Sequence, residues 1–134
     1  GIVTNEIVSK VQYNHSINNL RPALKEIYSD AFSVNNLDIM AFPSSLVTAN
    51  KLHEQIVHRL GEKEVPYLVA SSHNVQPATL CGNPGLTMPI GLTSRKLPAA
   101  IGFDAPFNHD RKLLAIGIAY EKIKPQIPRA KPII

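Results

Sequence analysis

The chain has 134 residues, of which 44% are hydrophobic and 18% charged, and its formal net charge is +4. This length and composition are typical of one globular domain, which buries roughly two-thirds of its unfolded surface. No apolar run approaches the roughly 20 residues that span a bilayer, and no signal-peptide pattern is present, so membrane insertion is not expected.

The first third of the sequence predicts two helices and a short strand. Apolar residues at helical spacing predict a helix over residues 4–18, with Thr4 as its candidate N-cap. A second helix is expected from near Pro22 to the pair Asn35-Asn36, because proline is tolerated in a first turn. Residues 37–42 are then expected to form a strand that ends at a proline.

The middle third has weaker patterns. Residues 50–60 carry apolar positions at helical spacing and are followed by Gly61, which predicts a helix with a glycine at its carboxyl end. Residues 65–70 fit either a strand or an extended lead into a short helix over residues 76–80.

The last third gives the clearest α/β pattern. Residues 85–92 and 97–103 are almost continuously apolar, which is typical of strands covered on both faces, and the basic turn 93–96 separates them. A helix is expected next, with Asn108 as its N-cap. Its broad apolar stripe consists of Leu113, Leu114, Ile116, Ile118 and Ala119.

Several segments also occur in an order that is known from one enzyme family. A glycine-ended helix leads through a proline turn into a strand, and the residues concerned are Pro77-Ala78, Gly82, Pro89, Gly91, Leu97-Pro98, the run 110–117, Glu121 and, upstream, residues 37–43. Together they resemble the carboxy-terminal part of the amidase-signature hydrolases, in particular the branch that includes indoleacetamide and mandelamide hydrolases. The resemblance covers most of residues 4–122.

This resemblance implies a fold and a domain organisation. The expected fold class is α/β, with a partial mixed sheet flanked by helices that corresponds to the carboxy-terminal portion of the amidase-signature fold. It would occupy residues 1–124, and a proline-rich basic tail would follow at residues 125–134.

The catalytic apparatus of that family has no counterpart in this sequence. Its members cleave amides with a Ser, a second Ser in a cis peptide linkage and a Lys, and the serines lie on a Gly/Ser-rich loop in the amino-terminal half. The pairs Ser44-Ser45 and Ser71-Ser72 lack neighbouring glycines and are interpreted as turn and capping serines. No catalytic residue is therefore assigned. The resemblance implies a segment of an amidase that hydrolyses a small carboxylic amide to acid and ammonia, is inactive alone and needs the amino-terminal catalytic half as its partner.

Candidate substrate-binding residues come from the same resemblance. In the family, the polar stretch before the glycine-ended helix approaches the substrate pocket, which implies roles for Ser72, His73 and Asn74, and for Thr79 one turn into that helix. The alternative is that Ser72 or Asn74 only caps the helix and that Thr79 is plain helix surface.

Metal and cofactor sites are not indicated. His53 and His58 are five residues apart, so on a helix they point roughly 140° away from each other. Cys81 is the single cysteine and has no Cys-x-x-Cys partner, so neither a zinc site nor an internal disulfide is expected. It is interpreted as a packed thiol, which suits the reducing cytoplasm.

Two alternatives remain open. The cations are dispersed without interleaved aromatic residues, so nucleic acid is not an expected partner, but a stand-alone α/β interaction module could use the basic tail 122–134. Within the family, the amidase component of a tRNA-linked amidotransferase is possible, although residues 110–121 are closer to the small-amide branch. An isolated amidase segment would expose an apolar sheet face and open strand edges, which predicts a homo-oligomer, whereas the module would be a monomer.

Overall fold

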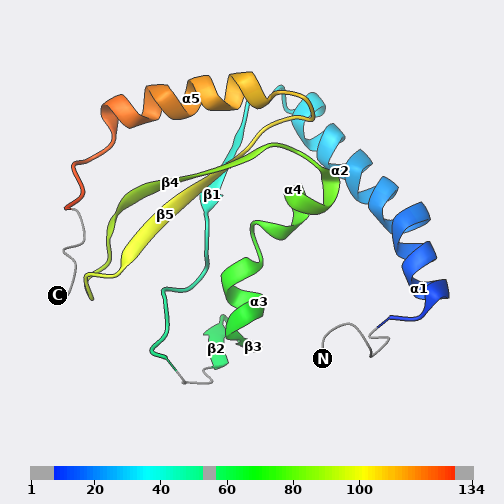
Figure 1. The fold of residues 1–134 in the computed structure, drawn as a ribbon, viewed down its shortest axis with the longest axis horizontal. Coiled ribbons are helices and arrows are strands. Elements are labelled where there is room, and N and C mark those ends of the chain that lie inside the picture. Colours follow the sequence, from blue (N-terminus) through cyan, green and yellow to red (C-terminus); the bar gives the residue numbers. More distant parts are fainter. Residues whose placement is uncertain (1–7, 53–56, 129–134) are drawn as a thin grey trace.

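The computed structural model describes residues 8–52 and 57–128 (Figure 1). In chain order its elements are α1 (Lys10–His15), the π-helical turn η1 (Ser16–Leu20), α2 (Arg21–Val34), β1 (Met40–Pro43), β2 (Val57–Leu60), β3 (Lys63–Pro66), α3 (Tyr67–Ser72), α4 (Gln76–Cys81), β4 (Gly85–Leu92), β5 (Pro98–Asp104) and α5 (Asp110–Ile123). The predicted α/β class, with a partial sheet flanked by helices, is confirmed, but within the described residues the strand pairs are antiparallel and not mixed.

The amino-terminal helices form one continuous rod rather than two separate helices. Ser9 begins it with a capping box, in which its hydroxyl accepts from the Gln12 N–H and the Gln12 side chain accepts from the Ser9 N–H. The π-helical turn joins α1 to α2, and Pro22 lies in the first turn of α2 as predicted. The predicted cap, Thr4, lies outside the described residues, while the predicted end of α2 at Asn35 is confirmed.

The helix predicted over residues 50–60 is wrong where the structure describes its second half. Residues 57–60 form β2, which pairs antiparallel with β3 across a turn at Gly61. Gly61 has φ +61°, a conformation that a hairpin turn and a helix terminus both require, so its presence in the sequence does not distinguish them. Of the ambiguous stretch 65–70, only residues 65 and 66 are strand, because α3 already begins at Tyr67.

The main sheet has the order β1-β5-β4, and both of its strand pairs are antiparallel. The strands predicted over residues 85–92 and 97–103 are confirmed as β4 and β5. The register places Gly85 opposite Asp104 and Thr87 opposite Gly102. Because side chains alternate along a strand, these four positions share one face of the sheet.

Helix α5 covers the other face of this sheet (Figure 1). The core cluster consists of Phe103, Ala105 and Leu113, with Leu86, Met88, Ile101, Ile39 and Tyr120 packed against it. Gly117 allows a close approach of α5 to the sheet, since a Cβ there would lie 2.5 Å from a Leu86 methyl carbon.

The predicted start of α5 at Asn108 is wrong. Asn108 has φ +64°, whereas an N-cap residue has extended backbone, and the N-cap position is His109, which makes no side-chain capping bond. The helix itself is present from Asp110. Only part of its apolar stripe is covered, because Leu113 is buried while Leu114 and Ile118 are 58% and 62% exposed.

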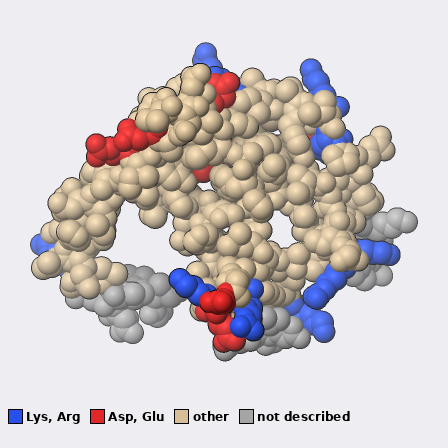
Figure 2. All heavy atoms as spheres, turned by 180° about the vertical axis from the view of Figure 1, so that it is seen from behind, with Lys and Arg blue, Asp and Glu red and all other residues tan. Residues whose placement is uncertain are grey.

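The prediction that β4 and β5 are covered on both faces is met only in part within the described residues. Residues of β4 alternate between exposed and partly buried, whereas Gly102, Phe103 and Asp104 at the end of β5 are all buried, although successive side chains point to opposite faces. Seen from behind, the surface shows few charged groups outside its rim (Figure 2).

Among residues 8–52 and 57–128, no helix has the length and hydropathy of a bilayer-spanning segment.

Candidate functional site

Of the predicted substrate-binding residues, Ser72 is the last residue of α3, His73 and Asn74 lie on the turn that follows, and Thr79 lies in α4. Ser72 donates from its hydroxyl to the Leu68 carbonyl at 2.6 Å and accepts from the Gln76 amide at 3.0 Å. Asn74 donates to the Pro43 carbonyl at 2.8 Å, which ties the turn to the end of β1. The side chains of both residues thus hold this turn in place.

Neither residue caps α4. Its N-cap position is Val75, and no side chain bonds there, so the alternative interpretation of Ser72 or Asn74 as a simple helix cap is wrong. His73 is exposed on the same turn. Thr79 donates its hydroxyl proton to the Val75 carbonyl at 2.9 Å, which leaves the lone pairs of its oxygen available.

The interpretation of both serine pairs as turn and capping residues is wrong for Ser71-Ser72, which are the last two residues of α3, whereas Ser44-Ser45 lie outside helices and strands. The Ser45 hydroxyl bonds to both the N–H and the carbonyl of Val47, and the Ser71 hydroxyl donates to the Leu68 carbonyl at 3.1 Å. The Ser44 hydroxyl is buried and has no partner within the described residues. No hydrogen bond in the part of the chain that the structure describes joins one of these serines to a basic side chain.

A small pocket lies between α4 and the face of the sheet that α5 leaves open. Its volume is about 220 Å³. Its lining residues are Phe42, Val75, Ala78, Thr79, Asn83, Gly85, Leu86, Thr87, Gly102 and Asp104. Thr79 is the only one of the four predicted residues that lines it; Ser72, His73 and Asn74 lie at the end of α3 and on the turn that follows.

Asp104 is the group in this pocket that sequence reasoning missed. Asp104 is only 4% exposed, and neither of its carboxylate oxygens accepts a hydrogen bond from the described residues. Burial raises its pKa from 3.8 to about 6. A signal was present, since Asp104 ends an otherwise apolar strand, but the sequence did not show that the strand end would be covered.

This pKa shift has a defined effect on stability. The folded carboxyl holds its proton more tightly than the unfolded one, so the folded state binds more protons between about pH 4 and 6. The free energy of unfolding therefore decreases as the pH rises through that range. The full shift corresponds to at most about 3 kcal/mol.

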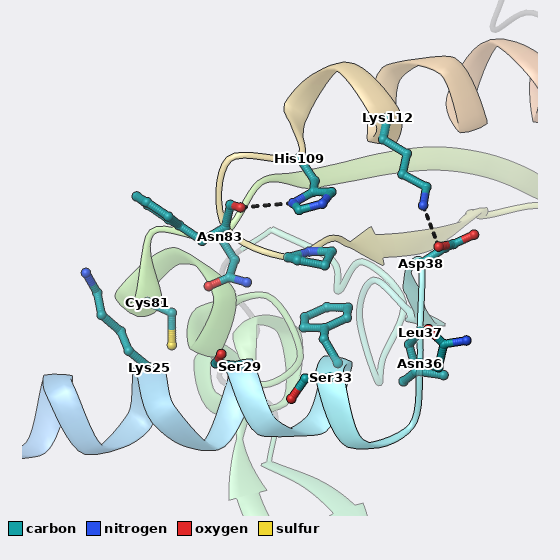
Figure 3. A pocket seen from close by; sticks show the side chains of 13 residues that line it. Lys25, Ser29, Ser33, Asn36, Leu37, Asp38, Cys81, Asn83, His109 and Lys112 are labelled. Carbon is teal, nitrogen blue, oxygen red and sulfur yellow. Dashed lines mark hydrogen bonds and ion pairs between the residues drawn. The ribbon is translucent and has the colours of Figure 1, made fainter.

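A larger pocket of about 580 Å³ lies between α2 and the segment that leads into α5 (Figure 3). At one side Lys112 forms an ion pair with Asp38, and His109 Nδ1 lies 3.0 Å from the Phe107 carbonyl. Cys81 lines the other side. Its burial raises the thiol pKa against the opposing effects of Lys25 and Arg21.

Cys81 is therefore a neutral, packed thiol at physiological pH, as predicted, and not an activated nucleophile. Within residues 8–52 and 57–128, no three His, Cys, Asp or Glu side chains gather as metal ligands would. His53, one of the two histidines considered as a pair, lies outside the described residues. His58 lies on β2, not on a helix, and its Nε2 is 3.1 Å from the side-chain oxygen of Asn50.

Relatives of known name place these features in context. No family model matches the chain. It is 33% identical over 119 residues to indoleacetamide hydrolase from Allorhizobium ampelinum, a match that covers 87% of this chain and 25% of that protein. It is 32% identical over 117 residues to indoleacetamide hydrolase from Agrobacterium vitis, with 86% and 25% covered. The chain thus spans about a quarter of the length of the curated relatives it matches.

Solved structures show the same fold. An amidase crystal structure aligns with a TM-score of 0.79 at 20% identity, over 88% of this chain and 26% of the other. The structure of 6-aminohexanoate cyclic dimer hydrolase aligns with a TM-score of 0.65 at 18% identity, over 89% and 26%. In sequence and fold the chain is therefore similar to one segment of amidases, as its resemblance to the carboxy-terminal part of an amidase-signature hydrolase predicted.

Proposed function

We propose that this chain acts as the carboxy-terminal segment of an amidase that hydrolyses a small carboxylic amide to the acid and ammonia. The single observation that supports this function is the 33% identity to an indoleacetamide hydrolase across 87% of the chain. The proposed contribution of the segment is structural: it supplies strands of the sheet and one side of the acyl pocket.

The chemistry would come from the remainder of the enzyme. In the amidase-signature hydrolases that the chain resembles, a Ser attacks the amide carbonyl while a second Ser and a Lys take its proton, and water then releases the acid. We assign none of these roles to residues of this chain. Ser72, His73, Asn74 and Thr79 stay proposed substrate contacts, supported by their position beside a pocket and by the hydrogen bonds that fix their turn.

The exposed apolar side chains support a larger covering partner. Val11 and Val34 on the amino-terminal rod are 78% and 80% exposed, and Leu114 and Ile118 on α5 are more than half exposed. Surfaces of this kind are usually covered by protein. The proposed partner is the amino-terminal catalytic half, and in its absence we expect self-association into a dimer or higher oligomer. Static light scattering over a range of protein concentrations measures this, and a monomer at all concentrations would contradict it.

We also propose the cytoplasm as the compartment and residues 125–134 as a tail separate from the domain. The buried, unpaired thiol of Cys81 supports the first proposal. The three prolines of the tail support the second, because proline cannot donate a backbone hydrogen bond to a helix or sheet.

The function is tested by complementation. The purified chain is assayed for ammonia release from indole-3-acetamide, alone and after co-expression with the Allorhizobium ampelinum relative from which the matching segment has been deleted. We expect no turnover by the chain alone, none by the truncated relative alone, and activity from the pair. Turnover by the pure chain, abolished by Ser72→Ala, would show that the proposed division of roles is wrong.

The proposed substrate contacts are tested in the complemented enzyme. Replacing His73 or Thr79 by Ala is expected to raise KM for the amide more than it lowers kcat, because these groups bind substrate and do not take part in the chemistry. Lys10→Ala on the distant amino-terminal helix serves as the control and is expected to change neither constant.

A further inference from the structure

The small pocket beside Asp104 presents hydrogen-bond acceptors to a ligand and has no basic side chain in its lining. The Thr79 hydroxyl donates its proton to the Val75 carbonyl, and the Asn83 amide nitrogen donates to the Ala105 carbonyl at 2.9 Å. The Thr79 hydroxyl oxygen and the Asn83 amide oxygen therefore offer lone pairs to a ligand, while the second N–H of the Asn83 amide stays available as a donor. Asp104 adds a carboxylate, and none of the residues that line the pocket is Lys, Arg or His.

The carboxylate is buried without compensation. A buried charge without a partner is costly, and proteins usually pair such a group or bind a cation to it. Within the described residues, ion pairs join Lys112 to Asp38 and Lys124 to Glu121, and neither includes Asp104. Burial and the Asp104 charge raise the pKa of the Tyr28 hydroxyl, which is itself neutral and cannot balance the carboxylate.

The strands keep the pocket open by lacking side chains. Gly85 lies directly opposite Asp104, and a Cβ at position 85 would lie only 3.3 Å from Asp104 Oδ1. A volume of about 220 Å³ is below the usual range for a drug-sized ligand, and it suits one polar head group with a few waters.

From these observations we propose that the Asp104 pocket, with Thr79 and Asn83, binds a small primary ammonium group. The N–H donors of such a group match the acceptors of the pocket, and its charge matches the carboxylate. The group has two possible sources: a free ammonium or methylammonium ion, or the head group of a lysine from another segment of the assembled enzyme. The inference concerns binding by this chain alone and does not depend on the proposed hydrolysis.

The test uses methylammonium chloride as the probe and tetramethylammonium chloride, which has no N–H donors, as the matched control. The Tm of the chain is measured by circular dichroism at pH 7.5 and constant ionic strength. We expect methylammonium to raise Tm along a saturable curve and tetramethylammonium to leave it unchanged, since a ligand that binds only the folded state stabilises it. Equal effects of the two salts, or no effect of either, would overturn the proposal.

Three variants assign the effect to the pocket. Asp104→Asn should abolish the rise in Tm, and Asp38→Asn, which removes an exposed carboxylate outside this pocket, should retain it. If Asp104→Asn does not fold, Thr79→Val removes one acceptor and should weaken the response to methylammonium. A rise that persists in Asp104→Asn, or in Thr79→Val at full strength, would refute the site.

The complemented pair separates the two sources. If the ammonium group belongs to a lysine of the other segment, the pair should no longer respond to methylammonium, whereas the isolated chain does. If the ligand is a free ion, both should respond. Failure of the pair to hydrolyse an amide would contradict the proposed function but would leave the response of the isolated chain intact.

Discussion

Replacing each of two adjacent leucines on α5 by alanine should change stability by very different amounts. Leu113 is 2% exposed and lies in the core cluster with Phe103 and Ala105. Leu114, the next residue, is 58% exposed. The same substitution on the same helix thus compares a core position with a surface position, and the change in helix propensity cancels between them.

The size of the effect follows from the burial. Buried Leu→Ala substitutions cost about 2.7–5 kcal/mol, through lost transfer free energy and the cavity that remains. Since the fully buried part of the α5 cluster has only three members, its surroundings can relax, and we expect the lower end, about 2–3 kcal/mol, for Leu113→Ala. Leu114→Ala should change the free energy of unfolding by less than about 0.5 kcal/mol, as at other surface positions.

Urea unfolding followed by far-ultraviolet circular dichroism measures both variants, at a protein concentration where light scattering shows no association. The midpoint for Leu113→Ala should decrease clearly, while that for Leu114→Ala should stay near the unmodified chain. Equal decreases would refute the placement of α5 on the sheet. Repeating the measurement at high concentration adds a second test, because Leu114→Ala should then weaken self-association if the exposed stripe is the contact between copies.

The remaining predictions concern a charge and a turn. Asp104→Asn should raise the free energy of unfolding at pH 7.5 by about 1–2 kcal/mol, because the amide cannot ionise. The same substitution should remove the decrease in stability between pH 4 and 6. Thermal unfolding across pH 4–8 checks this, and an unchanged pH profile would contradict it. Gly82→Ala should lower stability by about 1–2 kcal/mol, because Gly82 ends α4 with φ +77°. Gly82→Asn should cost less, since asparagine tolerates this conformation, and equal costs in urea titrations would argue against backbone strain as the cause.

Local patterns predicted the carboxy-terminal part of the fold well. The apolar runs of β4 and β5 and the short helix over residues 76–80 depend on residues that are near one another in the sequence, and each matches the structure, while the helix end at Gly82 was implied by the family resemblance. The error at residues 57–60 has a physical cause, because Gly61 at positive φ serves a helix end and a hairpin equally well. Only pairing with β3 decides between a helix end and a hairpin at Gly61, and the local sequence pattern does not predict that pairing.

The candidate site was predicted less completely than the fold. Thr79 was found through a family resemblance, and it does line the pocket. Asp104 was missed because its burial depends on α4 and on the opposing glycine of β4, which are brought to it by strand register. A carboxylate that ends an apolar run is ordinarily solvated, so the local pattern offers no reason to treat this one as buried.

The sheet face opposite α5 connects the two proposals. At Gly102 a Cβ would lie 2.6 Å from the Phe42 ring, so this strand must present bare backbone where the ring lies across it. The same face carries Gly85 and the buried carboxylate of Asp104, and it is the face that α5 leaves open. A face built from glycines, one aromatic ring and an unpaired acid is poorly suited to permanent contact with water. If the proposed amino-terminal half covers this face, it has to approach the backbone closely and meet the acid with hydrogen-bond donors, and a lysine of that half is then the expected occupant of the Asp104 pocket.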